Sequence, residues 1–227
     1  MRSRWGPISG VLLCLSWAPM ALAVPRLPAL GSAVEVETFW RAHIGLMQAV
    51  ILSVSVGYLF LLDFLGALAA RLHATPGAVT AGWTAVGSAL MFMTALNAAI
   101  GLDVAGGLLL DVAPGATYLL HTAGFVLAAP AALAGVAFFV AVARVAFRTP
   151  ALPRWSGWVA VAAVVLNAGA LSLAGPLNSG NGLVGGIAAP LGAFVVWILG
   201  VSVWWLRRGR DPRSGAVATR GRGAGSG

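Results

Sequence analysis

The chain has 227 residues, of which 59% are hydrophobic and only 9% are charged, and its mean hydropathy is +0.92. A soluble domain carries about 25% charged residues, so this composition excludes an ordinary water-soluble protein and is typical of a chain whose surface faces lipid. The formal net charge of +8 does not indicate a nucleic-acid partner, because the arginines flank apolar segments and form no patch with stacking aromatic residues.

Six segments of the chain are apolar over roughly the 20 residues that a membrane-spanning helix needs. They cover residues 7–24, 44–69, 78–101, 117–142, 156–174 and 187–206. Segments of this length are too long to be buried strands. The sequence therefore predicts an all-α fold, a polytopic transmembrane helix bundle of six spans that forms one domain over residues 1–206.

The first segment has two interpretations. "MRSR", the apolar "GVLLCLSW" and the "ALA" before Val24 are the three parts of a secretory signal peptide. The apolar run is also long enough to be a first span, so residues 1–23 are either a span or a cleaved leader. In both cases the chain enters the second segment from outside. Before that segment, Ser32 and Glu35 have the spacing of a helix capping box.

The distribution of arginine predicts the orientation, because cytoplasmic loops carry an excess of positive charge. With the N-terminus inside, twelve of the fourteen arginines are cytoplasmic, and only Arg26 and Arg41 are outside. The cytoplasmic set is Arg2, Arg4, Arg71, Arg144, Arg148, Arg154 and the six arginines that follow Leu206. The sequence thus predicts both termini inside.

Four polar residues within the segments are candidates for a site. Counting 1.5 Å per residue along a helix, Gln48, Asn97 and His121 lie near the outer ends of their segments, and Asn167 lies just past the midplane. Polar side chains in spans usually face the bundle interior. These four either hold the helices together by hydrogen bonds or line an outward-facing pocket for a small ligand.

Asp63 is the acidic residue within a predicted span, and it lies in the inner half of the bilayer about two helical turns before Arg71. An unpaired carboxylate at that depth would take up a proton or recruit a partner. Arg144 is at a matching depth, so we predict an Asp63–Arg144 ion pair. The alternative is a carboxylate that relays protons or couples a cation.

Two of the three histidines are candidate ligands. His43 and His121 are both predicted near the outer surface, where they are candidates for axial haem ligation or for a metal site with Asp103 or Asp111. No HExxH or comparable spacing supports either site. We therefore predict no catalytic residue, no metal and no cofactor.

The stretch "GNGLVG", residues 180–185, matches G-x-G-x-x-G. A dinucleotide loop must follow a strand and have an acidic residue about 20 positions on, whereas here an apolar segment precedes it and tryptophans follow. We expect a tight outer hairpin, or a partly re-entrant lip over an outer pocket, between the last two spans. Residues 207–227 are rich in Gly and Arg, and predict a disordered basic cytoplasmic tail that attracts anionic lipids.

Two stretches carry a family resemblance. "LPRWSGWVAVAAVVLNAGAL", from Leu152, and "PLGAFVVWILGVSVWWLRR", ending at Arg208, resemble uncharacterised bacterial multi-pass membrane proteins grouped as a domain of unknown function. The resemblance implies about six spans and supplies no activity or functional residues.

The sequence as a whole predicts an integral protein of the bacterial plasma membrane whose first partner is the lipid bilayer. The leading hypothesis is a structural or partner-binding membrane subunit. The alternative is a small-solute or proton-coupled carrier that uses the outer polar residues and Asp63. A membrane enzyme or haem protein has the least support, because no catalytic constellation is found in the sequence.

Overall fold

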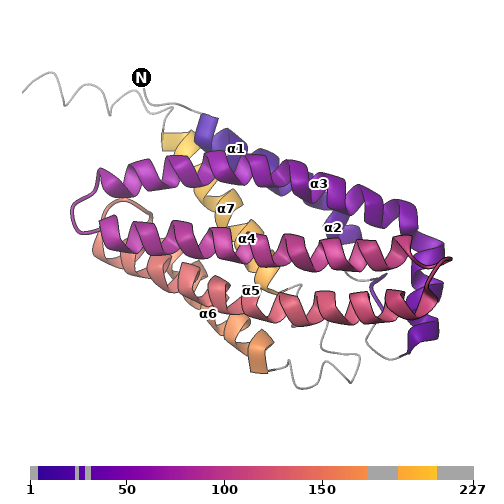
Figure 1. Ribbon diagram of the computed structural model, residues 1–227. Helices are drawn as coiled ribbons and strands as arrows, with labels where there is room; N and C mark the ends of the chain where they lie inside the picture. Colours follow the sequence, from indigo (N-terminus) through magenta and orange to yellow (C-terminus); the bar gives the residue numbers. More distant parts are fainter. Residues whose placement is uncertain (1–4, 24–25, 29–31, 173–188, 209–227) are drawn as a thin grey trace, which may run out of the picture.

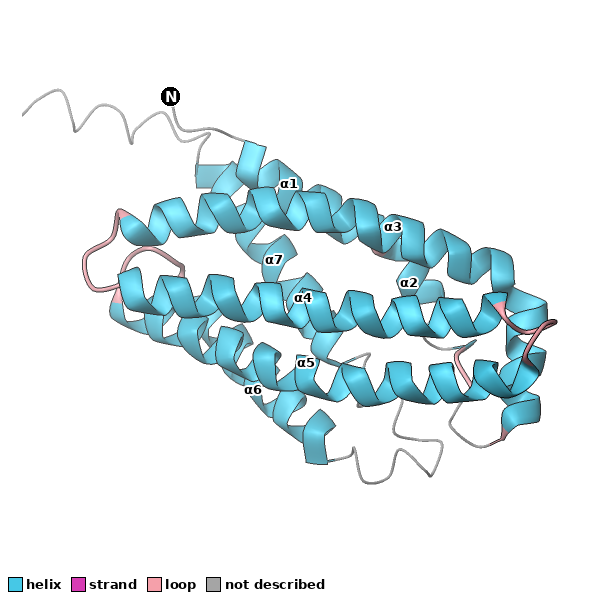
Figure 2. Ribbon diagram, viewed as in Figure 1, coloured by secondary structure: helices cyan, strands magenta, loops and turns pink. Residues whose placement is uncertain are grey.

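The computed structural model describes residues 5–23, 26–28, 32–172 and 189–208. These residues form helices joined by turns, with no strand in the described part of the chain (Figure 2). The helices are α1 (Trp5–Ser16), α2 (Ala18–Ala23), α3 (Ala33–His73), α4 (Val79–Leu108), α5 (Pro114–Arg148), α6 (Arg154–Ser172) and α7 (Ala189–Arg208). The predicted all-α fold is confirmed.

Four of the described helices are long and apolar enough to cross a membrane, namely α3, α4, α5 and α7. The predicted segments coincide with them but end too early. Helix α3 has 41 residues, which corresponds to about 60 Å, twice the ~30 Å thickness of a bilayer core. Its first residue follows Ser32, whose side chain accepts a hydrogen bond from the backbone N–H of Glu35 at 3.2 Å. The predicted helix cap is therefore present.

The predicted first segment is interrupted. Helix α1 ends at Ser16, and the short helix α2 begins at Ala18. Pro19 explains the break, because proline has no N–H to donate and its ring clashes with the carbonyl group four residues earlier. Trp17, at the junction, is only 4% exposed. A single continuous helix over residues 7–24 was therefore a wrong prediction.

Helices α4 and α5 form an antiparallel hairpin with a much shorter turn than predicted. The predicted gap of residues 102–116 shrinks to residues 109–113, because α4 continues to Leu108 and α5 starts at Pro114. Proline is favoured in the first turn of a helix, where its missing N–H would have no partner in any case. Asp103 consequently belongs to a helix rather than to an outer loop.

The three long helices lie side by side, and the other helices pack on one side of them (Figure 1). Helix α1 packs against α3 and α7, and α6 packs against α5 and α7. An aromatic cluster joins α7 to the long helices: Phe194 stacks on Phe92 of α4 at 5.0 Å, and Trp197 meets the edge of Phe138 of α5 at 5.2 Å. These ring contacts hold α7 against α4 and α5.

Glycines let the helices of the hairpin approach closely. A Cβ added at Gly124 would lie 2.8 Å from the carbonyl oxygen of Ala99, and one at Gly106 would lie 3.0 Å from that of Thr117. The hydroxyl of Thr117 donates a hydrogen bond to the carbonyl of Gly106 at 2.8 Å. Small residues at helix contacts are the usual means of tight packing in membranes.

We expect Gly124→Ala to destabilise the protein by about 1–3 kcal/mol, because its methyl group meets backbone that cannot rotate away. The measurement is thermal unfolding in detergent. Gly101→Ala is the matched control in α4, since nothing lies within 4 Å of the added atom, and it should be neutral or stabilising by less than about 1 kcal/mol. Equal destabilisation by the two variants would contradict the packing.

Candidate functional site

The hairpin holds a buried carboxylate–imidazole pair. Nδ1 of His121 lies 2.5 Å from Oδ1 of Asp103. His121 is 0% exposed and Asp103 is 7% exposed. Ionised side chains avoid such surroundings unless they are paired. Asp103 and His121 are thus the strongest candidate for a functional site among the described residues.

The hairpin itself brings the two residues together. In an antiparallel helix pair, residues equidistant from the turn face each other. Asp103 and His121 are 18 residues apart and lie symmetrically about residue 112, in the turn between the helices. The contacts of Gly106 with Thr117 and of Gly124 with Ala99 have nearly the same centre of symmetry. The close glycine packing therefore sets the distance between the two side chains.

The second ring nitrogen of His121, Nε2, is buried and has no hydrogen-bond partner among the described residues. The ring instead meets Phe125 edge to face, with 4.8 Å between the ring centroids. A buried polar atom left without a partner typically costs about 1–3 kcal/mol. The fold thus retains an unsatisfied nitrogen on the side of the imidazole away from Asp103.

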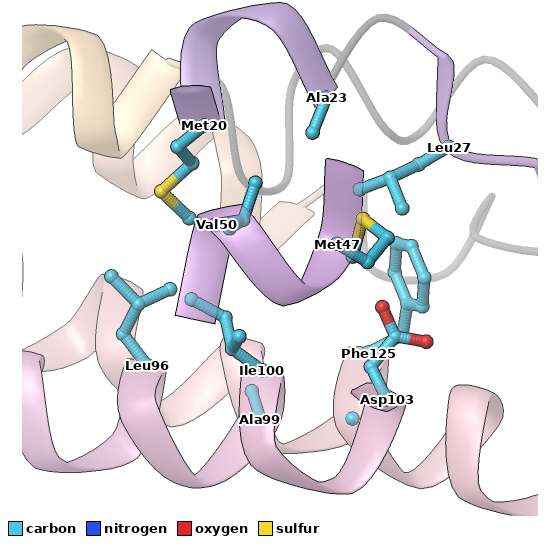
Figure 3. A pocket seen from close by; sticks show the side chains of 11 residues that line it. Met20, Ala23, Leu27, Met47, Val50, Leu96, Ala99, Ile100, Asp103 and Phe125 are labelled. Carbon is cyan, nitrogen blue, oxygen red and sulfur yellow. The ribbon is translucent and has the colours of Figure 1, made fainter. Parts of the chain in front are cut away.

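A small cavity of about 40 Å³ adjoins Asp103, between α2, α3, α4 and α5. Figure 3 shows the carboxylate group of Asp103 among apolar side chains, close to Phe125 and Met47. Among the described residues that line the cavity, Asp103 alone is charged; the others are Met20, Ala23, Leu27, Met47, Val50, Leu96, Ala99, Ile100, Gly124 and Phe125. A cavity of this volume admits about one water molecule.

This arrangement can hold a proton in more than one place. A proton between an imidazole nitrogen and a carboxylate oxygen in direct contact can be carried by either atom. The adjacent cavity gives a water molecule room to reach the carboxylate. The chemistry available to this pair is uptake, storage and release of a proton.

The structure does not gather the four predicted polar residues. His121 belongs to the pair, whereas Gln48 is exposed on α3 and Asn97 is half-buried on α4. Asn167 is fully buried on α6, where its side-chain amide donates to the carbonyl of Ala163 at 2.7 Å. It packs against Gly135 of α5, whose missing side chain makes room for it. Asn167 therefore supports the contact between α5 and α6.

Asp63 does not pair with Arg144. Its carboxylate accepts hydrogen bonds from Nε1 of Trp5 at 2.9 Å and from the hydroxyl of Ser9 at 3.5 Å, both in α1. Arg144 is exposed on α5, and no ion pair joins it to Asp63. The predicted partner was wrong because depth alone was matched, and depth does not say which helices are neighbours. The acid instead ties α1 to α3.

The other groups considered as ligands lie apart. His43 stacks on Phe39 and contacts its carbonyl at 3.0 Å, and Asp111 forms an exposed ion pair with Arg41 at 2.9 Å. Within the described ranges, no three His, Cys, Asp or Glu side chains come close enough to hold a metal ion. The "GNGLVG" stretch lies outside the described residues, as do residues 209–227 of the predicted tail, whereas Arg207 and Arg208 belong to α7.

Comparison of the chain with protein-family models, with curated proteins and with solved structures gives no match. The importance of the pair therefore follows from its own geometry. The sequence offered one signal for it, which is the symmetric placement of an acid and a histidine about a short turn containing Asp111 and Pro114.

A double-mutant cycle tests the pair. Asp103→Leu or His121→Leu alone should cost about 3 kcal/mol, because the remaining partner is left buried and uncompensated. The double variant should be more stable than the sum of the single effects predicts, by about 1–3 kcal/mol. Unfolding of all four proteins in the same detergent gives the coupling. Additive effects would show that the side chains do not interact.

Proposed function

We propose that the protein is an integral membrane protein of six spans with both termini in the cytoplasm of a bacterium, in which α1 and α2 together form the first span. The support is the distribution of charge along the helices. Arg41 of α3 lies at one end of the bundle, whereas five arginines at the ends of α3, α5, α6 and α7 gather at the other: Arg71, Arg148, Arg154, Arg207 and Arg208. That end is the cytoplasmic one by the positive-inside rule. Membership of the uncharacterised multi-pass group named above is part of this proposal.

Single cysteines test the orientation after Cys14 has been replaced by serine. We expect Asp111→Cys, in the exposed turn between α4 and α5, to react with a membrane-impermeant maleimide in intact cells. Ala74→Cys, exposed at the other end after α3, should react only after the cells are permeabilised. The reverse pattern would overturn the proposed topology.

The function that the geometry supports best is that of a proton-coupled carrier of a small solute. One observation supports it above all, namely the buried Asp103–His121 pair beside a cavity lined mainly by apolar side chains. Ionisable residues within membrane helices are costly and mark proton or ion pathways by default. Tight packing alone would be served better by an apolar pair of similar volume.

The coupling follows from the position of the pair. Asp103 is on α4 and His121 is on α5, so a change in their shared proton changes the attraction between the two helices. The same helices line the cavity together with α2 and α3. Proton uptake and the packing of the cavity are thereby linked, which is the elementary requirement for coupled transport.

A second function, that of a partner-binding membrane subunit, has one specific observation in its favour. Val34 and Val112 are 72% and 83% exposed, and Val34 is 39 residues from the end of α3 at His73. That distance corresponds to about 58 Å, more than the ~40–45 Å of a bilayer with its head groups. Val34 therefore lies past the lipid, where another protein could cover it.

The carrier proposal predicts which acid matters. In proteoliposomes loaded with a pH indicator, Asp103→Asn should abolish proton uptake, while Asp63→Asn should leave it unchanged because Asp63 serves the α1–α3 contact. Infrared difference spectra between two pH values report carboxyl protonation directly. Of the two variants, only Asp103→Asn should remove the carboxyl band of the unaltered protein. Loss of uptake in Asp63→Asn alone would move the coupling to that residue. Normal uptake in both variants would favour the subunit.

A further inference from the structure

The arginine-rich end of the bundle contains a stacked arrangement of cations and aromatic rings. The guanidinium carbon of Arg71, at the end of α3, lies 5.4 Å from the ring centroids of both Trp204 and Trp205 in α7. Arg208, one turn further along α7, lies 4.4 Å from the ring of Trp204. Two positive charges from different helices are thereby held against a single indole ring.

The arrangement is built on a rigid support. Trp205 stacks on the buried ring of Phe64 at 5.6 Å, and Nε of Arg71 donates a hydrogen bond to the carbonyl of Ala151 at 2.8 Å, in the turn between α5 and α6. Three parts of the chain therefore fix Arg71. Trp204 is half-buried and Arg208 is exposed, so this part of the arrangement lies at the surface rather than in the core.

The charge and the position favour one kind of ligand. Two guanidinium groups near one indole ring concentrate positive charge where the ends of α3 and α7 meet, which favours an anionic ligand there. Arginine binds phosphate oxygens through paired N–H groups. Tryptophan prefers the head-group level of a bilayer. The anion found at that level is the phosphate group of a lipid, and basic pockets between helices on this side of a membrane bind anionic head groups.

We propose that Arg71, Trp204 and Arg208 form a binding site for the head group of an anionic phospholipid between α3 and α7. The site is separate from the Asp103–His121 pair, which lies at the opposite end of the long helices. Its three side chains belong to the described helices α3 and α7.

The test measures lipid binding to the full chain in a non-ionic detergent by native mass spectrometry. Phosphatidylglycerol should bind at least about tenfold more tightly than phosphatidylcholine with the same acyl chains. Arg71→Gln combined with Arg208→Gln should lower the affinity for phosphatidylglycerol by about thirtyfold, because each arginine near the lipid surface contributes about fivefold to the affinity. Arg208→Gln alone should weaken the binding of phosphatidylglycerol by about fivefold. Because this single variant keeps the Arg71–Ala151 hydrogen bond, it still tests the site if the double variant folds poorly.

The matched control removes two arginines from the same end of the bundle. Arg144 and Arg148 are both exposed on α5, and their replacement by glutamine should change the affinity less than about twofold. Trp204→Leu keeps every charge but removes the ring, and it should weaken binding. If the two arginine double variants lost the same affinity for phosphatidylglycerol, the site would be overturned, because the net charge of the protein would then explain the binding. Displacement of the lipid by millimolar inorganic phosphate would overturn its assignment to lipid.

Discussion

The close approach of α4 and α5 is the contact on which the rest of the structure depends. Lipid offers no hydrogen bonds to the backbone and no hydrophobic force between helices, so tight packing must hold them together. Gly106 and Gly124 permit this packing. Its consequence is chemical as well as structural, because only helices this close can bring a carboxylate on one into direct contact with an imidazole on the other.

The same hairpin shows what a sequence can and cannot predict about such a protein. Hydropathy located the apolar segments, and Ser32 with Glu35 located the start of α3. Hydropathy failed at the outer end of the hairpin, because Asp103 interrupts the apolar run of α4 without ending the helix, which continues to Leu108. Asp103 was thus placed in a loop. A single-residue feature, Pro19, was present in the sequence, yet its effect on the first segment was missed.

The candidate site was only half predictable for a related reason. His121 was recognised from its type and depth, but its partner depended on which helix faces meet. The same uncertainty paired Asp63 with Arg144, whereas the structure gives Asp63 the indole of Trp5. Counting residues along a helix gives only the depth of a side chain in the membrane. The neighbour of a side chain depends on helix rotation and order, and those follow from packing contacts such as Gly135 with Asn167.

The two ends of the bundle differ in kind. One end holds Arg71 and Arg208 against tryptophan rings, and the other holds the Asp103–His121 pair. Asp111, in the turn between α4 and α5, is exposed and reaches Arg41 of α3. In the proposed orientation this turn lies outside the membrane, so an antibody that binds it would act directly on the hairpin that holds the Asp103–His121 pair.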